Sequence, residues 1–168
     1  MACACSIAGL RTTTSDRPVA SEVNFYHLTR ASLEEALPRL LAKTLQAGER
    51  AVVMLGSPER VDALNTHLWT FDPGSFLPHG SAKDGEPARQ PVWLTHLDEN
   101  PNGATFLFVA DHARSEKVDD YKRCFELFDG RDESAVAEAR ERWKAYRAAG
   151  HAVVYWQQTA SGGWEKKS

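Results

Sequence analysis

The last predicted helix, residues 133–149, carries the side chains whose types and spacing point most directly to a binding site. At about 100° per residue, one face about 100° wide gathers an aliphatic residue, an aromatic ring and three cations: Val136, Arg140, Trp143, Lys144 and Arg147. An aromatic wall beside cations suits a ligand that joins an apolar group to an anion. In the alternative interpretation, Trp143 packs in the core and the cations are its solvated flank. The helical pattern leaves both interpretations open.

A second pair of aromatic residues lies at the end of an earlier predicted helix and in the loop that follows it. Trp69 ends the run His-Leu-Trp, and Phe76 lies in the proline-bounded run Gly-Ser-Phe-Leu-Pro-His at residues 74–79. Large aromatic side chains in such places either cover the core or anchor a protein partner.

The residues that catalysis would need do not occur at the required spacing. A phosphate-binding loop requires several glycines before Lys and Ser or Thr, whereas residues 27–32, after the first predicted strand, contain no glycine. After the second strand there is only Gly56, and the following Pro58 removes a backbone donor. No Gly-x-Ser-x-Gly nucleophile motif occurs. Asp111 and His112 follow a strand end, where α/β proteins often hold functional groups, but are interpreted as solvated loop residues. We therefore expect no catalytic residue and no cofactor.

Candidate metal ligands are scattered. The six histidines form no His-x-His or His-x-x-x-His pair. Cys3 and Cys5 lie near the N-terminus without a neighbouring histidine, and Cys124 stands alone. We expect no metal site. An odd number of cysteines without regular spacing also argues against a disulfide framework and favours a reducing, cytoplasmic location.

Alternating strand and helix patterns must position these residues. Runs of apolar, β-branched and aromatic residues predict strands at 22–28, 51–55, 91–97, 105–110, 124–128 and 152–157. Helical periodicity and capping signals, such as the capping box of Ser32 and Glu35, predict helices at 33–47, 58–69 and 133–149. The alternation indicates an α/β fold with a mixed, mostly parallel sheet and helices on both faces. An Asn-Pro-Asn-Gly turn between the strands at 91–97 and 105–110 predicts an antiparallel hairpin.

Length and composition indicate a globular protein with one main domain. The chain has 168 residues, of which 42% are hydrophobic and 26% charged, enough for a packed core under a solvated surface. The formal net charge of -3 gives no electrostatic reason for the whole protein to bind nucleic acid. No apolar run approaches the ~20 residues that cross a bilayer. We expect a flexible N-terminal extension at residues 1–21, an α/β domain at 22–157 and a flexible C-terminal tail at 158–168.

Taken in order, several segments resemble the chi subunit family of bacterial DNA polymerase III. They are the Asn-Phe-Tyr-His-Leu strand at 24–28, the Leu-Trp at 68–69 before Ser-Phe-Leu-Pro-His at 75–79, and Glu-Arg-Trp-Lys-Ala-Tyr-Arg-Ala-Ala-Gly at 141–150. The similarity covers about residues 22–157. It implies a Rossmann-like three-layer fold without a phosphate-binding loop, which agrees with the missing glycines.

The resemblance also implies a function and two partners. Members of this family are non-catalytic accessory subunits of the clamp-loader complex in DNA replication. They bind the psi subunit and the acidic C-terminal tail of single-stranded DNA-binding protein, which ends in a Phe carboxylate, and they meet DNA only indirectly. Transferred to this sequence, the tail site comprises Arg140, Trp143 and Lys144, with Arg147 added by helical position. The psi interface comprises Trp69 and Phe76.

The sequence departs from the family at several points, and two other functions remain open. Trp143 stands where Tyr is common, Val136 occupies a position that can be basic, and the segments before Glu22 and after Gln158 are not typical. An enzyme of nucleotide-binding ancestry would be distinguished by nucleotide binding. A module that binds single-stranded nucleic acid directly would bind bare strands with a steep dependence on salt.

Overall fold

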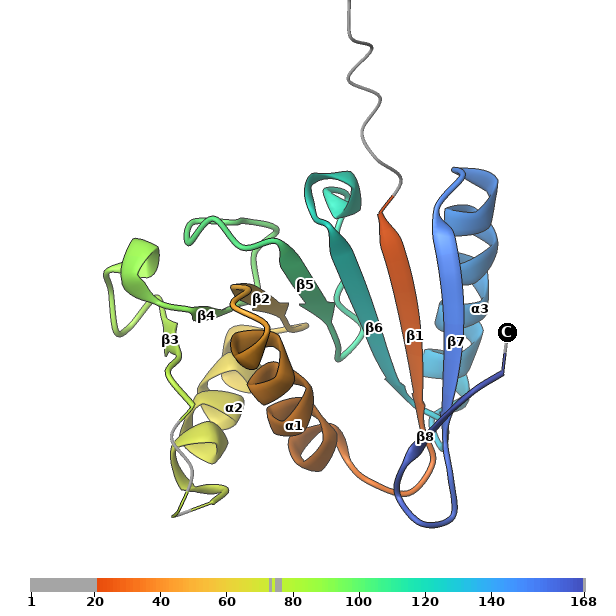
Figure 1. Cartoon of the computed structure of the whole chain (residues 1–168), viewed down its shortest axis with the longest axis horizontal. Helices are drawn as coiled ribbons and strands as arrows, with labels where there is room; N and C mark the ends of the chain where they lie inside the picture. Colours follow the sequence, from red (N-terminus) through yellow and green to blue (C-terminus); the bar gives the residue numbers. More distant parts are fainter. Residues whose placement is uncertain (1–20, 73, 75–76, 168) are drawn as a thin grey trace, which may run out of the picture.

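One eight-stranded sheet runs through the domain, and seven of its strands are parallel (Figure 1). The computed structural model describes residues 21–72, 74 and 77–167. The strand order is β3-β4-β2-β5-β6-β1-β7-β8. The strands are β1 (Glu22–Leu28), β2 (Ala51–Met54), β3 (Gly80–Ser81), β4 (Val92–Thr95), β5 (Phe106–Val109), β6 (Arg123–Asp129), β7 (Ala152–Gln158) and β8 (Trp164–Lys166).

Three helices begin at the capping signals that the sequence contains. They are α1 (Leu33–Gln46), α2 (Pro58–Thr70) and α3 (Glu133–Ala148). The backbone N–H of Ser32 donates to the Glu35 carboxylate at the start of α1. At the start of α3, the Asp132 carboxylate accepts the backbone N–H groups of Ser134 and Ala135. Short 3-10 turns lie at Pro87–Arg89 and Val118–Asp120.

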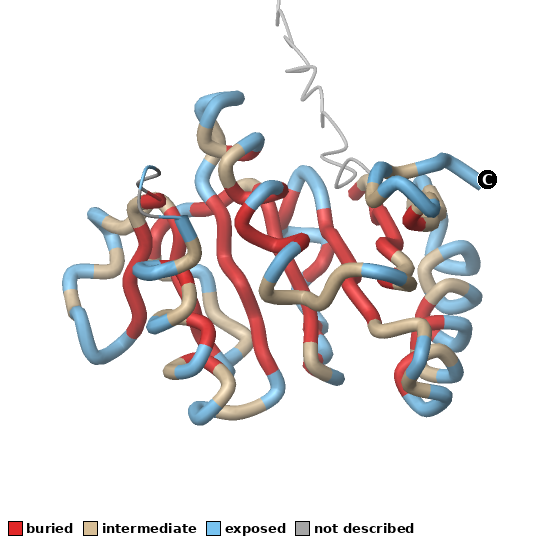
Figure 2. Tube along the Cα trace, turned by 90° about the horizontal axis from the view of Figure 1, so that it is seen from below, coloured by how far each residue is buried: buried red, intermediate tan, exposed pale blue. Residues whose placement is uncertain are grey.

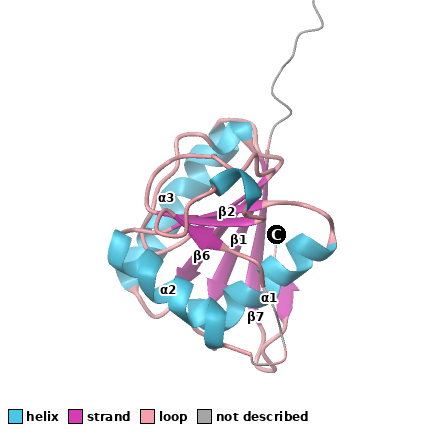
Figure 3. Ribbon diagram, turned by 90° about the vertical axis from the view of Figure 1, so that its left-hand side faces the viewer, coloured by secondary structure: helices cyan, strands magenta, loops and turns pink. Residues whose placement is uncertain are grey.

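The helices cover both faces of the sheet, as Figure 3 shows. Leu37 and Leu41 of α1 and Leu64 of α2 pack with one face of the strands. Ala135 and Ala139 of α3 pack with the opposite face. The buried strands between them form the centre of the molecule, while α3 keeps an exposed outer side (Figure 2). The predicted three-layer α/β arrangement with a mixed, mostly parallel sheet is confirmed.

The predicted hairpin between residues 91 and 110 is wrong. β4 and β5 do not pair with each other, because each pairs in parallel with β2, which lies between them. The Asn-Pro-Asn-Gly segment forms a return loop. Its Asn102 side chain donates to the backbone oxygens of Ala51 and Gln90, next to the first residues of β2 and β4. The loop therefore brings the chain back to the edge where parallel strands begin.

The C-terminal segment differs from the predicted flexible tail. A turn at Thr159, whose N–H donates to the oxygen of Gly163, leads into β8, which pairs antiparallel with β7. The Trp164 ring meets the Tyr26 ring edge-on, with centroids 4.8 Å apart. This ring contact stabilises a strand that is too short to show hydrophobic periodicity in the sequence. The predicted N-terminal extension lies outside the described residues except for Ser21, whose hydroxyl donates to the oxygens of Val118 and Tyr121.

Candidate functional site

A pocket of about 350 Å³ lies between α3 and strands β1, β6 and β7. Its walls are mostly apolar and are formed by Phe25, Phe128, Val136, Ala139, Trp143 and Tyr155. Two cations of α3, Arg140 and Lys144, complete the lining together with His27 of β1. The structure thus brings three of the four predicted tail-site residues to one cavity.

Trp143 both packs against the core and lines the pocket. Its ring packs edge-on against Phe25, with centroids 5.3 Å apart, and against Tyr155 at 6.0 Å. These contacts attach it to the core cluster under α3. The ring is nevertheless only partly buried and lines the pocket. It can therefore offer an apolar wall that the core holds in place, with little conformational entropy left to lose on binding.

The cations of α3 differ in position. Arg140 is exposed, and among the described side chains none forms an ion pair with it. Lys144 lies 3.5 Å from Glu141, but both side chains are largely exposed, so this pair contributes little. Arg147 is exposed and does not line the pocket; it lies about two helical turns beyond Arg140 on the same side of α3. It can only extend a cationic strip away from the cavity.

His27 and Tyr155 form a polar pair in the pocket that the sequence interpretation missed. The Nδ1 atom of His27 shares a hydrogen bond with the Tyr155 hydroxyl, and its ring stacks on Phe128 with centroids 4.9 Å apart. A side chain at Gly130 would clash, since its Cβ would lie 1.9 Å from His27 Nε2. Burial lowers the pKa of His27 and raises the pKa of Tyr155, and the charge of Arg140 lowers both. Because side chains alternate along a strand, His27 lies on the same face as Phe25, and this alternation could have identified it from the sequence.

A buried ion pair holds α3 against the sheet. The Nε of Arg142 donates to the Glu126 carboxylate at 3.0 Å, and the Tyr146 hydroxyl donates to the other oxygen at 2.9 Å. The side chains of Arg142 and Glu126 are only 8% and 1% exposed. Burial raises the pKa of Glu126, against the opposing effects of its two donors. The sequence interpretation missed this pair, although a glutamate within the apolar run of β6 was a signal for it.

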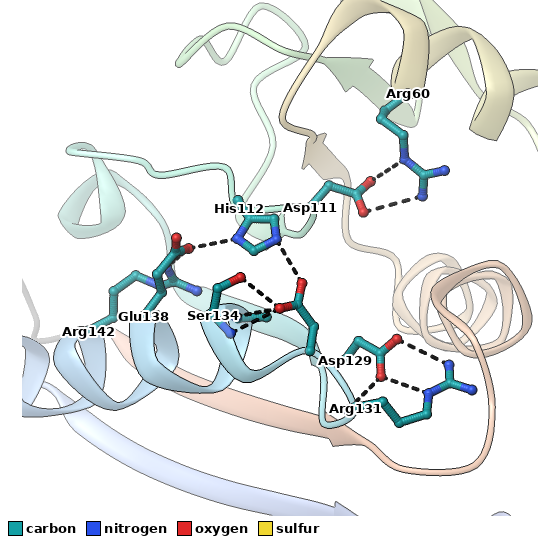
Figure 4. Close-up of polar contacts among 10 residues, drawn as sticks. Arg60, Asp111, His112, Asp129, Arg131, Ser134, Glu138 and Arg142 are labelled. Carbon is teal, nitrogen blue, oxygen red and sulfur yellow. Dashed lines mark hydrogen bonds and ion pairs between the residues drawn. The ribbon is translucent and has the colours of Figure 1, made fainter.

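A second cavity, of about 360 Å³, lies where β1, β5 and β6 end, and it is lined by paired charges. Figure 4 shows Arg60 of α2 reaching the Asp111 carboxylate, with Nε 2.8 Å from one oxygen. The same guanidinium lies 2.8 Å from Glu34 of α1. His112 bridges Asp132 at 3.2 Å and Glu138 at 2.9 Å. These contacts cross-link the loops and helix ends around the crevice where α/β folds commonly bind ligands.

The loop after β1 directs its backbone donors to a side chain of the protein itself. The N–H groups of Arg30 and Ala31 donate to Gln158 Oε1 at 2.9 and 2.8 Å. The single glycine after β2 has a packing role, because a Cβ at Gly56 would lie 2.2 Å from the Asp111 backbone oxygen. Asp111 and His112 are themselves in left-handed conformations, with φ of 52° and 62°. They lie in a loop, as predicted, with His112 exposed and Asp111 half-buried, and both also form cross-links.

The predicted psi interface is described only in part. Trp69 lies at the end of α2, is 54% exposed, and its ring centroid lies 4.8 Å from that of His79. Phe76 lies outside the described residues. Within residues 21–72, 74 and 77–167, no group of three or more His, Cys, Asp or Glu could hold a metal ion. No helix in that part of the chain has the length and apolar character to span a membrane.

Comparison with known proteins gives one consistent family. Residues 21–154 match the family model described as DNA polymerase III chi subunit, HolC. A probable DNA polymerase III subunit chi of Rickettsia prowazekii is 31% identical over 107 residues, which are 62% of this chain and 65% of that protein. The chain therefore spans just under two thirds of the length of this relative.

Two further relatives bear the same name. The DNA polymerase III subunit chi of Haemophilus influenzae is 23% identical over 138 residues, covering 79% of this chain and 94% of that protein. That of Escherichia coli is 25% identical over 122 residues, covering 71% and 82%. The family match extends from the first residues of β1 into β7 and includes all of α3, which carries the cations of the pocket. The chain belongs to the DNA polymerase III chi subunit family.

Proposed function

We propose that this chain is a non-catalytic accessory subunit of the DNA polymerase III holoenzyme that binds the C-terminal tail of single-stranded DNA-binding protein in the pocket beside α3. One observation carries the proposal: a mostly apolar cavity has an arginine without an ion-pair partner among the described side chains beside an aromatic wall. A peptide that ends in a Phe carboxylate matches it, because the ring can pack on Trp143 and the carboxylate can reach Arg140.

The cations have unequal roles in this proposal. Arg140 can bind the terminal carboxylate through two parallel hydrogen bonds, a geometry that lysine does not reproduce. Lys144 on the lining and Arg147 beyond it attract the acidic residues that precede the terminal Phe. Such exposed charges mainly accelerate association and are screened by salt.

Titration of a fluorescent tail peptide tests this assignment. Arg140→Ala and Trp143→Ala should each weaken binding by about 1–3 kcal/mol. Lys144→Ala and Arg147→Ala should weaken it less and should reduce the salt dependence between two salt concentrations. A peptide without its last Phe should bind poorly to the wild-type protein. If Arg140→Ala binds the tail as tightly as wild type, the carboxylate is held elsewhere.

A fold control accompanies Trp143→Ala, because this ring also contacts Phe25 in the core. Its circular dichroism and melting temperature should be compared with those of Arg140→Ala, whose side chain is exposed. Loss of binding without loss of fold in Arg140→Ala is then the decisive result.

The psi subunit is proposed as the second partner, bound through Trp69 and Phe76 and linking the chain to the clamp loader. The exposure of Trp69 at the end of α2 supports this role. Trp69→Ala should no longer co-purify with psi, because removing such an anchor typically costs about 2 kcal/mol or more of binding free energy. Leu97→Ala is the matched control, because Leu97 is another large exposed hydrophobic residue, 52% exposed, on a different loop. Equal psi retention by both variants would refute the assignment.

The proposed adaptor has no chemistry of its own and acts in the cytoplasm. The ion pairs that line the crevice and the Gln158 contact with the loop after β1 support this proposal against an enzyme of nucleotide-binding ancestry. Purified protein should show no ATP hydrolysis, nuclease or polymerase turnover. It should also bind bare single-stranded DNA weakly, since the tail and not the strand is its ligand. Turnover abolished by a point substitution in the crevice would contradict the proposal.

A further inference from the structure

Three groups from three different elements meet in the pocket beside α3. Arg140 comes from α3, Tyr155 from β7 and His27 from β1, and all three line the cavity. The Tyr155 hydroxyl and His27 Nδ1 share a hydrogen bond. Arg140 is close enough for its charge to oppose protonation of His27 and favour ionisation of Tyr155. A polar cluster thus adjoins walls that are otherwise apolar.

We propose that Tyr155 and His27 complete the carboxylate-binding end of this pocket, with the Tyr155 hydroxyl donating to the ligand while His27 Nδ1–H donates to the Tyr155 oxygen. The inference rests on the proposed function, because the ligand it concerns is a peptide with a free C-terminal carboxylate. In this arrangement the Tyr155 hydroxyl is a second donor group for the carboxylate, beside the Arg140 guanidinium. A carboxylate can accept both, since its two oxygens offer about four acceptor sites.

The hydrogen bond between the two side chains has two possible directions. When His27 Nδ1 carries no proton, the Tyr155 hydroxyl donates to it and has no hydrogen for a ligand. When Nδ1 is protonated, it donates to the Tyr155 oxygen, and the hydroxyl hydrogen is released for an anion in the pocket. Binding of a carboxylate therefore selects a form of His27 with a proton on Nδ1, which is either the neutral Nδ1–H tautomer or the imidazolium. The Phe128 stack and the close approach of Gly130 keep the imidazole in place during this change.

A bound carboxylate also favours the charged form of His27 over the neutral one. The charged and titratable groups facing His27 are Asp129 from β6, Tyr155 from β7, and Arg140 from α3, with Lys144 on the same pocket lining. In the free protein, burial and Arg140 lower the pKa of His27. A bound carboxylate offsets the charge of Arg140 and so raises that pKa again. Because the pKa of His27 in the free protein lies below its ordinary value of about 6.5, affinity should increase as pH falls from about 7 to about 5, where a terminal carboxylate of pKa about 3.5 remains ionised.

Two tail peptides that differ only in a free or an amidated C-terminus test the role of Tyr155. For wild type and Tyr155→Phe, fluorescence anisotropy gives the affinity of each peptide. Tyr155→Phe should lose about ten-fold for the carboxylate peptide and less than about two-fold for the amide, as expected for one hydrogen bond to a charged group. The substitution keeps the ring and thus the apolar wall. Equal losses for both peptides, or none for either, would overturn the proposal.

His27→Gln provides an independent measurement. The glutamine amide does not titrate, so the affinity for the carboxylate peptide should no longer increase as pH falls from about 7 to about 5. A pH dependence that persists unchanged in His27→Gln would contradict the proposed linkage. If wild type prefers the carboxylate peptide through Arg140 but Tyr155→Phe keeps that preference, only this inference fails. If wild type binds neither peptide, the proposed function fails and this inference with it.

Discussion

Replacing Arg142 with methionine should destabilise the domain far more than its position on a mostly exposed helix suggests. Methionine has a similar length and favours helix, so the substitution mainly removes the guanidinium. The Glu126 carboxylate, 1% exposed, would then lose its 3.0 Å donor and keep only the Tyr146 hydroxyl at 2.9 Å. Removing one partner of a buried ion pair typically costs about 3–5 kcal/mol. We expect about 3 kcal/mol, because Tyr146 still donates.

The dependence of this cost on pH follows from Glu126. Burial raises its pKa in the folded state, and removing Arg142, whose charge and hydrogen bond lower that pKa, should raise it further. A group whose folded pKa lies above its unfolded value contributes stability below the unfolded pKa and loses it as pH rises through the folded pKa. The deficit of Arg142→Met relative to wild type should therefore grow between pH 5 and pH 8.

Urea unfolding followed by circular dichroism measures these differences, with Arg140→Met as the matched control. Arg140 lies on the same helix but is exposed, so its replacement should change stability by at most about 0.5 kcal/mol. The double variant Glu126→Leu/Arg142→Met removes both charges of the buried pair and should cost about 2 kcal/mol less than the sum of the two single substitutions. If Arg142→Met resembles Arg140→Met, or if the two losses add, the pair does not hold α3 as described.

Three further predictions concern other parts of the domain. Trp164→Ala should lower the free energy of unfolding by about 1–3 kcal/mol, because the ring packs edge-on against Tyr26; an unchanged urea midpoint would mean that the C-terminal strand is dispensable. The hydrogen bond with Glu138 raises the pKa of His112, so protonated His112 stabilises the fold below its unfolded pKa and this contribution is lost as pH rises. His112→Gln should therefore destabilise the protein more at pH 6 than at pH 8.5 in thermal melts. A chain that begins at Ser21 should melt within a few degrees of the full chain by calorimetry, whereas a loss of about ten degrees would show that residues 1–20 pack on the domain.

The order of the three helices and of the longer strands could be predicted because local sequence signals agree with the places where the chain enters and leaves the sheet. The capping box at Ser32 and Glu35 and the proline after Ser57 start helices where the chain must leave the sheet. Apolar runs such as Ala51–Met54 become strands that are buried throughout. Each signal depends on a few neighbouring residues, so one sequence was enough to recognise it.

Strand pairing was harder to predict, since partners are chosen between distant segments. The Asn-Pro-Asn-Gly turn favoured a hairpin, but β2 has buried positions throughout and inserts between β4 and β5. At the C-terminus, β8 is too short to show periodicity and is held by the ring of Trp164. In both cases a long-range contact outweighed the local pattern.

The sequence by itself determined which side of α3 carries an aromatic ring among cations, because a helix places residues on its surface by a fixed rotation per residue. Only the tertiary structure decided which strands face that side. It brought Phe25 and His27 from β1, Phe128 from β6 and Tyr155 from β7 against one helix and so formed a cavity. It also decided that Arg142 is buried on Glu126 while Arg140 is exposed. Two arginines on one helix acquire opposite roles because burial depends on the packing of α3 against the sheet, which spacing along the chain does not specify.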